Sequence, residues 1–306
     1  MPKYFKRPGE NSQPHLIDQL RLPIGEPVEL AVWAIKQRAI RCRVLPSQEP
    51  VTFRLVRDEV EGEIITVVPD KVWQYKQTVY MTGKVTGSRL DVAQLGLVPL
   101  KLEEREICDE EELQDIVSKD DPFMIWYQPI LATGPRRAFE MEQIIPFSDP
   151  ANWDEDPITQ AVDAYESGDH AAAWQMVGEL LAEDLRCIDG HAHLGNWEFN
   201  FYETPHARTE NRARRHYQVG IQIAELSLAN EFKGLLPWHH IDNRPYLRCL
   251  HGYGLCLWRA GETQAARAVF EKMLWLNPYD NQGARFLLAD IAKGKTWYKS
   301  LAEDRR

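Results

Sequence analysis

The sequence of 306 residues lacks the cysteine pattern of a disulfide-bonded or thiolate-zinc protein. Its five cysteines are an odd number, and no two are spaced as Cys-x-x-Cys. We therefore expect reduced thiols, which are typical of a cytosol. The chain has no run of about 18 apolar residues, the length that a membrane-spanning helix needs. Its start also lacks the apolar core of a secretion signal. These absences predict a cytoplasmic protein without a membrane partner.

Catalytic signatures are absent as well. The chain has no phosphate-binding Gly-x4-Gly-Lys-Ser/Thr loop, no Gly-x-Gly-x-x-Gly, no Gly-x-Ser-x-Gly and no His-Glu-x-x-His. We expect a non-enzymatic protein without a cofactor. A metal-dependent enzyme remains an alternative because histidines gather in the C-terminal half. They are His170, His191, His193, His206, His216, His239, His240 and His251. Residues two apart on a helix face different directions, so His191 and His193 are not assigned as joint metal ligands.

Positive charge is in deficit. Lysine and arginine number 36 against 46 aspartate and glutamate residues, a net charge of −10. By residue count, residues 1–150 and 151–306 share this deficit equally. We therefore expect no basic domain, and no broad grip on duplex DNA or an anionic membrane. The length and the ordinary apolar share, 44%, predict about two globular domains.

What the first half does contain is a series of short β-branched runs between residues 27 and 102. They are Val28–Ala34, Ile40–Leu45, Val51–Arg57, Glu63–Val68, Val79–Val85 and Leu97–Leu102. Turn residues separate them at Pro46, Asp58, Pro69-Asp70 and Thr86-Gly87-Ser88. This spacing predicts a small antiparallel β barrel or sandwich. It follows an irregular segment, 1–26, with at most a short helix around His15–Leu20.

Small barrels often bind single-stranded nucleic acid through aromatic and basic surface residues. The candidates in this sequence are Trp73, Tyr75, Lys76, Tyr80 and Lys84. In the structural alternative the rings fill the barrel and the lysines only solvate it. The acidic balance of the chain favours that alternative. A regulator that binds RNA or another single strand is therefore the second hypothesis for function.

An acidic connector, 103–153, follows the β-rich module. Its first part, 103–121, is rich in aspartate and glutamate. Asp109 is placed to cap a short helix that runs to Val117, with acids in its first turn. Residues 122–153 either complete the β module or pack it against the helices.

From residue 154 to the end the pattern is helical, and the clearest segment is 247–279. Gly254 and Ala266 would let two antiparallel helices approach closely, and Phe270 would fill the neighbouring space. Gly261 would form the turn, and Pro278 would end the second helix. The segment resembles the tetratricopeptide repeat family, whose Gly, Ala-x3-Phe and Pro it keeps. Its first helix departs from the family's Trp-x2-Leu-Gly-x2-Tyr opening.

Two weaker copies precede this segment. In 156–185, Ala161, Gly168 and Ala173 take the equivalent positions, and a third copy begins at Asp189. The third copy has Leu194-Gly195 in its first helix and Ala213 with Tyr217 in its second. The overall prediction is an α+β chain, with the barrel or sandwich followed by a tetratricopeptide-like helical array. The stretches 236–240 and 276–285 resemble bacterial repeat proteins of unassigned role, which implies no function.

The resemblance implies a concave groove lined by the first helix of each repeat. The residues that it places there are Asn196, Asn200, Arg248, His251, Trp258, Arg259 and Arg285, with Asp189, Ala192, Phe199, Leu255 and Gln282 beside them. Such a groove would suit an acidic or aromatic peptide, unless the arginines only solubilise the surface. The acidic 103–121 segment would compete for it. The leading hypothesis is a scaffold or adaptor that binds a protein or peptide.

Overall fold

The computed structural model describes residues 22–36, 38–54, 58–118, 120–149, 156–200 and 207–304. The expected helical stretch around His15–Leu20 and the candidate ligand His206 lie outside these residues. The described chain forms two compact units. We call residues 22–54 with 64–89 the barrel unit, and residues 58–63 with 90–304 the helical unit.

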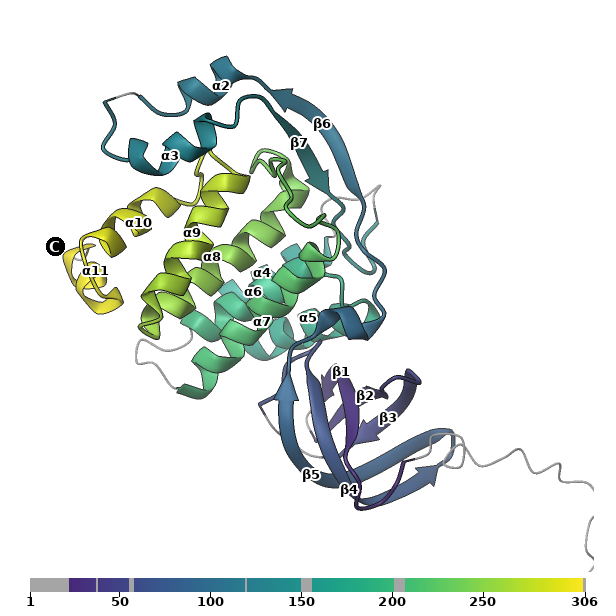
Figure 1. The fold of residues 1–306 in the computed structure, drawn as a ribbon. Helices are drawn as coiled ribbons and strands as arrows, with labels where there is room; N and C mark the ends of the chain where they lie inside the picture. Colours follow the sequence, from purple (N-terminus) through teal and green to yellow (C-terminus); the bar gives the residue numbers. More distant parts are fainter. Residues whose placement is uncertain are drawn as a thin grey trace, which may run out of the picture. The chain divides into compact units, whose positions relative to one another are not determined.

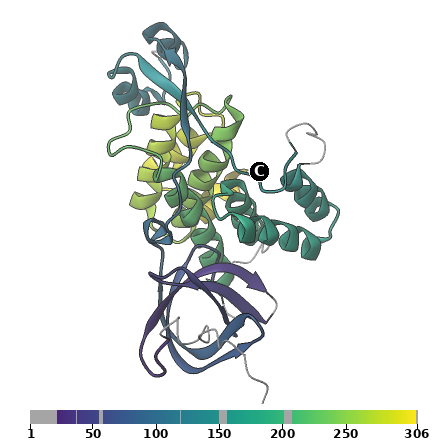
Figure 2. The same ribbon diagram turned by 90° about the vertical axis from the view of Figure 1, so that its right-hand side faces the viewer.

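Five strands close into a barrel in the barrel unit, and Figure 2 shows them curving round. Around the barrel they are β1 (Val28–Lys36), β2 (Ala39–Val44), β3 (Glu49–Phe53), β5 (Thr78–Arg89) and β4 (Ile64–Tyr75), which pairs with β1 again. All neighbours are antiparallel except β3 and β5, which run parallel. The prediction of a small barrel is confirmed. The prediction that all its strands pair antiparallel is wrong, because strand directions cannot alternate all the way round a closed ring of five strands.

The barrel is filled by the inward-facing residues of the five strands. Its buried core consists of Leu30, Val32, Ile40, Cys42, Val44, Val51, Phe53, Ile65, Val67, Val79 and Met81. On β2, β3 and β5 these residues alternate with partly or fully exposed ones, which is the period of two that a half-buried strand requires. β1 and β4 depart from this alternation, because Ala31 and Ile64 on their other face are also buried. The strands that keep the alternation bury one face and present the other outward.

Two strand breaks predicted at turn residues, and one predicted strand, were wrong. β4 runs through Pro69-Asp70, and β5 runs through Thr86-Gly87-Ser88. The β4–β5 register shifts between Pro69 and Lys71 and between Thr66 and Val67. These β-bulges let proline and glycine stay inside long strands. The expected strand at 97–102 is absent: a short helix, η1 (Val92–Leu95), ends in left-handed Gly96, residues 97–101 form no strand, and the next strand begins only at Leu102.

The helical unit begins with a two-stranded ribbon and two short helices. The ribbon pairs β6 (Leu102–Cys108) with β7 (Arg136–Met141), and α2 (Glu110–Asp115) and α3 (Met124–Leu131) lie between them in sequence. Asp109 caps α2 in a reciprocal capping box with Glu112, as predicted. The ribbon is a sheet of its own. Two backbone hydrogen bonds, at 2.8 and 2.9 Å, join β7 to Leu235, which lies in the segment between α7 and η3.

The remaining helices form the body of the unit. They are α4 (Pro157–Glu166), α5 (His170–Glu183), α6 (Ile188–Asn200), α7 (Ala207–Glu225), η3 (Ile241–Asn243), α8 (Arg244–Arg259), α9 (Thr263–Leu276), α10 (Ala284–Ala292) and α11 (Trp297–Asp304). From α4 to α10 each α-helix packs against the next one, and α6 also contacts α8. Figure 1 shows α6 to α9 lying side by side. None of the helices in the described residues combines the length and apolar character that crossing a membrane requires.

The same close approach recurs in two successive helix pairs. A Cβ added to Gly254 of α8 would lie 2.5 Å from the ring of Phe270 on α9. A Cβ added to Gly195 of α6 would lie 2.5 Å from the ring of Tyr217 on α7. In both pairs a buried alanine precedes the ring by four residues, Ala266 and Ala213 respectively. Each pair is therefore built on one glycine that a large ring covers.

Candidate functional site

The outer face of the barrel carries a row of side chains that crosses four strands. Trp73 of β4 is the cross-strand partner of Tyr80 on β5, and Tyr80 in turn pairs with Thr52 on β3. Thr52 pairs with Arg41 on β2. Directly opposite residues share a face of the sheet, and the neighbours of Tyr80, Val79 and Met81, point into the core. The row therefore lies on the outside.

The two aromatic rings of this row are stacked, and cations flank them. The ring centroids of Trp73 and Tyr80 are 5.6 Å apart with an interplanar angle of 15°. The guanidinium of Arg54 lies 5.1 Å from the Tyr80 centroid and 5.9 Å from the Trp73 centroid, and the Lys71 ammonium lies 5.4 Å from Trp73. Both rings are partly exposed, and both cations are exposed. We call these four residues with Arg41 the aromatic row.

The other sequence candidates on the barrel lie around this row. Tyr75, at the end of β4, is 62% exposed, and the Lys76 ammonium lies 5.6 Å from its ring. Lys84 is exposed farther along β5, opposite Val68. Trp33 on β1 is covered by the guanidinium of Arg43, 3.6 Å from its centroid.

Sequence reasoning missed the arginines of the barrel. Arg41 and Arg43 alternate with the buried Ile40, Cys42 and Val44 on β2. That alternation was the signal that could have placed both arginines outside. Neither they nor Arg54 forms an ion pair with a carboxylate among the residues that the structure describes.

Charge is distributed unequally between the units, which corrects the expectation of no basic domain. Over its described residues the barrel unit has nine lysine and arginine residues against four acids, a net charge of +5. The described part of the helical unit has 19 against 37, a net charge of −18. Acidic residues 58–63 interrupt the barrel strands in sequence and acidic residues 103–121 follow them, but both segments belong to the helical unit. They masked the positive charge in the total for residues 1–150.

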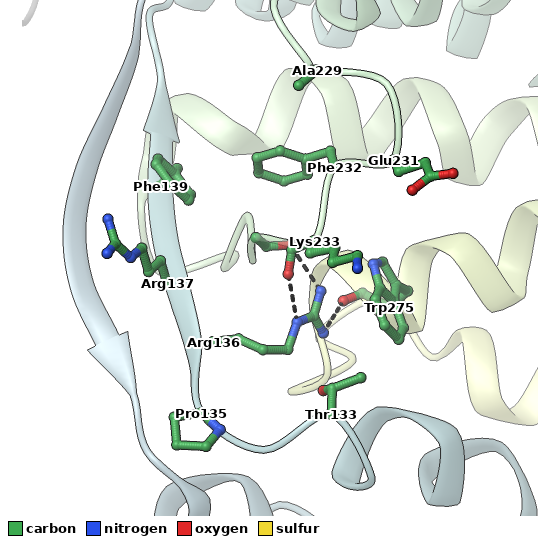
Figure 3. Close-up of a pocket in the computed structure, with 11 residues that line it drawn as sticks. Thr133, Pro135, Arg136, Arg137, Phe139, Ala229, Glu231, Phe232, Lys233 and Trp275 are labelled. Carbon is green, nitrogen blue, oxygen red and sulfur yellow. Dashed lines mark hydrogen bonds between the residues drawn. The ribbon is translucent and has the colours of Figure 1, made fainter.

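The helical unit has a pocket of about 490 Å³ beside β7 and the end of α9. Figure 3 shows Phe139 and Phe232 facing each other on one side of it, with Trp275 on another. The two phenylalanine rings are 5.5 Å apart. Arg137 and Lys233 also line the pocket, but Arg137 donates to Glu104 at 2.8 Å.

Arg136 also lines this pocket and connects β7 to two other chain segments. Its guanidinium donates to the backbone oxygens of Lys233, Gly234 and Trp275 at 2.7–2.8 Å (Figure 3). It also lies 4.1 Å from the centroid of the Trp275 ring. Burial lowers the pKa of Arg136 to about 10, where it is still protonated at neutral pH. A cation near the last carbonyls of α9 also matches the negative end of the helix dipole.

The arginines expected to line a groove are engaged within the helical unit. Arg248 forms an ion pair with Asp189 at 2.7 Å. The guanidinium of Arg259 lies 3.7 Å from the centroid of Phe199. Arg285 is 3.7 Å from Asp280 and lies over the ring of Phe286 at 4.9 Å.

The polar and aromatic groove candidates are also held inside the chain. Trp258 is 2% exposed and donates to the Lys295 carbonyl. Asn196 accepts a hydrogen bond from the Tyr217 hydroxyl at 2.7 Å. Burial lowers the pKa of His251 to about 4, so this imidazole is neutral at pH 7. Asn200 ends α6, and its side chain lies outside the described residues.

The remaining packing candidates lie where helices meet or turn. Ala173 is fully buried in the core that α4, α5 and α6 share. Gly168 has a φ of 91° in the turn between α4 and α5, a conformation that favours glycine. Pro278 follows Asn277, where α9 ends.

Competition of the acidic segment for the groove would require it to lie against Arg248. Arg248 instead forms its ion pair with Asp189. The acids of β6 instead form ion pairs with Arg105, Arg137, His239 and His240. The reason is local, because the ribbon brings Arg105 and Arg137 next to these glutamates. The segment is thus mainly a paired strand and a capped helix rather than a solvated connector.

The histidines fall into two environments. His191 and His216 are fully buried with their rings 5.8 Å apart, and burial lowers both pKa values, that of His191 to about 4. His239 and His240 are more accessible and converge on Glu106. The hydrogen bond from His239 lowers the pKa of the Glu106 carboxyl. The sequence suggested His239 and His240 as metal ligands but contained no sign of the third residue.

Comparison of the chain with protein-family models, curated proteins and solved structures returns no match.

Proposed function

We propose that the chain binds single-stranded nucleic acid on the outer face of its barrel unit. The observation that carries the proposal is the stacked pair of Trp73 and Tyr80 with Arg54 and Lys71 beside it. Aromatic faces stack with unpaired bases, whatever their sequence, and adjacent cations attract the phosphates. The strands hold both rings in place before a ligand arrives, so little side-chain freedom is lost on binding.

Electrostatics support the same surface. The described barrel residues carry a net charge of +5 within a chain of −10. Arg54 lies over aromatic rings rather than against a carboxylate. A cation without an acidic partner can exchange its water and counterions for phosphate oxygens. Duplex DNA keeps its bases stacked inside, so the aromatic row favours single strands.

The test is the affinity of the full chain for a fluorescent single-stranded oligonucleotide, measured by anisotropy. Trp73→Ala and Tyr80→Ala should each weaken binding by roughly 5- to 150-fold, because stacking on one aromatic ring contributes about 1–3 kcal/mol per base. Tyr298→Ala is the matched control, since this ring is 57% exposed on α11 of the helical unit. It should leave the affinity unchanged.

Two results would count against the proposal. One is equal affinity for the single strand and its duplex. The other is equal binding by the parent, Trp73→Ala and Tyr80→Ala, with circular dichroism showing that all three are folded.

We infer a second candidate function, protein binding, for the helical unit as a tetratricopeptide-like array. Two observations support this proposal. A glycine lies against a large ring in both the α6–α7 and the α8–α9 pair. Helix α6 also contacts both α7 and α8. An exposed apolar surface is present where α3 meets α10. Ile125 is 67% exposed and Phe286 53%, and the Phe123 ring packs edge-on against Phe286 at 5.1 Å. Exposed apolar surface of this kind is typical of interaction sites.

Affinity purification from the native cell separates the two candidates, provided that proteins and nucleic acid are both identified. Protein capture that Phe286→Ser abolishes would support the second function. Nucleic-acid capture that Trp73→Ala abolishes would support the first. Protein partners that Phe286→Ser retains would argue against the α3–α10 surface.

A further inference from the structure

Three possible metal ligands from distant parts of the sequence meet on the helical unit. Glu106 lies on β6, and His239 and His240 lie in the turn before η3. One ligand atom from each residue lies within 4.8 Å of the other two. The Nε2 atoms of both histidines face the same oxygen, Oε1 of Glu106, at 2.9 and 3.2 Å.

The two imidazoles share one side of the chain although they are neighbours in sequence. Successive side chains of an extended segment point in opposite directions. Here the turn brings the two ring centroids to 4.3 Å from each other. Both ring nitrogens therefore point at the same small volume.

The scaffold of the three residues is fixed by buried hydrogen bonds. Asn243 is fully buried and donates to the carbonyls of Phe139 on β7 and Pro237 before the histidine turn. Its side-chain oxygen accepts from the backbone N–H of Met141 at 2.9 Å. β7 pairs with β6, where Glu106 lies opposite Ala138. One amide thus ties the histidine turn to the ribbon that carries Glu106, and a preorganised ligand set binds a metal more tightly.

We propose that Glu106, His239 and His240 bind one divalent transition-metal ion of the zinc class. Two imidazole nitrogens and one carboxylate oxygen form a ligand set that zinc accepts, with a fourth position left for water. Magnesium and calcium prefer sets made of oxygen atoms. Glu106 and His239 are about half exposed, so an ion and a water molecule can reach the site. The ion would take the place of the two hydrogen bonds between Nε2 and the carboxylate, and each neutral imidazole would carry its proton on Nδ1.

The experiment is a zinc titration of the untagged full chain by calorimetry, with equilibrium dialysis and metal analysis for stoichiometry. The parent should bind one zinc ion. His240→Ala and Glu106→Gln should each weaken binding by more than about 100-fold, since loss of an outer-shell partner alone costs roughly 10- to 100-fold. His170→Ala is the matched control, because it removes an exposed histidine at the start of α5. It should bind zinc like the parent.

The same variants separate loss of the site from loss of the fold. Without zinc, Glu106→Gln should unfold at nearly the parent temperature, because the Glu106 side chain is half exposed. His240 is only 16% exposed on its side chain, so circular dichroism checks that His240→Ala is folded. Added zinc should then raise the unfolding temperature of the parent and of His170→Ala only. The proposal is overturned if the parent binds no zinc, if His240→Ala and Glu106→Gln bind it as tightly as the parent, or if magnesium binds in preference to zinc.

Discussion

Both units place arginines over aromatic rings, but the helical unit also pairs arginines with buried carboxylates. On the barrel, Arg43 and Arg54 lie over aromatic rings. In the helical unit, Arg212 and Arg215 form ion pairs with Glu198 and Glu63, at 2.6 Å each. An arginine paired with a buried carboxylate has its charge compensated inside the chain, whereas the exposed Arg54 over partly exposed rings keeps its charge available to a ligand. The surface of a chain with a large negative total can therefore still attract an anion locally.

The strongest test of this contrast is the removal of a buried pair. Arg215→Gln would leave Glu63, which is 1% exposed on its side chain, without its cation. The free energy of unfolding of the helical unit should fall by about 3–5 kcal/mol, because an uncompensated buried charge is costly. Arg267→Gln is the matched control. Its partner Glu271 is exposed, so the change should stay within about 0.5 kcal/mol. Urea denaturation measures both, and equal effects would contradict the contrast.

Helix packing should be the next most sensitive feature. Gly254→Leu would force a side chain into the Phe270 ring and should cost about 3 kcal/mol of unfolding free energy. The control is Gly178→Leu on α5, where an added Cβ meets nothing within 4 Å. That variant should be as stable as the parent or slightly more stable, because leucine favours a helix more than glycine does. Thermal unfolding followed by circular dichroism compares them, and a Gly254→Leu melt like that of the parent would rule out the α8–α9 packing.

Acid should destabilise the helical unit through its buried histidines. The pKa of His191 is about 4 in the folded chain, and its unfolded value is about 6.5. Because the folded pKa is the lower one, the stabilising effect of neutral His191 is present above pH 6.5 and is lost as the pH falls toward 4. Between pH 7 and pH 4.5 the parent should lose roughly 2–3 kcal/mol more than His191→Gln does. Denaturation at the two pH values measures this difference, and equal losses would show that His191 does not titrate as described. The described barrel residues contain no histidine, so histidine protonation should not lower the stability of the barrel unit.

The barrel and the helix pairs could be predicted because their signals are local. Short β-branched runs between turn residues predicted the small barrel, and the spacing of Gly254, Ala266 and Phe270 indicated a close helix pair. The bulges that keep Pro69 and Gly87 inside strands depend on the neighbouring strand, which the sequence does not identify. The meeting of Glu106 with His239 depends on pairing across 133 residues. The charge of the barrel was hidden because acids adjacent in sequence belong to the other unit.

The most direct test of the central proposal is the salt dependence of oligonucleotide binding by the full chain. Binding to a single strand should weaken steeply as salt rises, with a logarithmic slope of about −0.7 for each phosphate neutralised. Arg41→Gln and Arg54→Gln should each make the slope shallower by roughly one such step, whereas Arg248→Gln should leave it unchanged. A slope near zero in the parent, or slopes that Arg54→Gln and Arg248→Gln change equally, would contradict a nucleic-acid-binding face on the barrel.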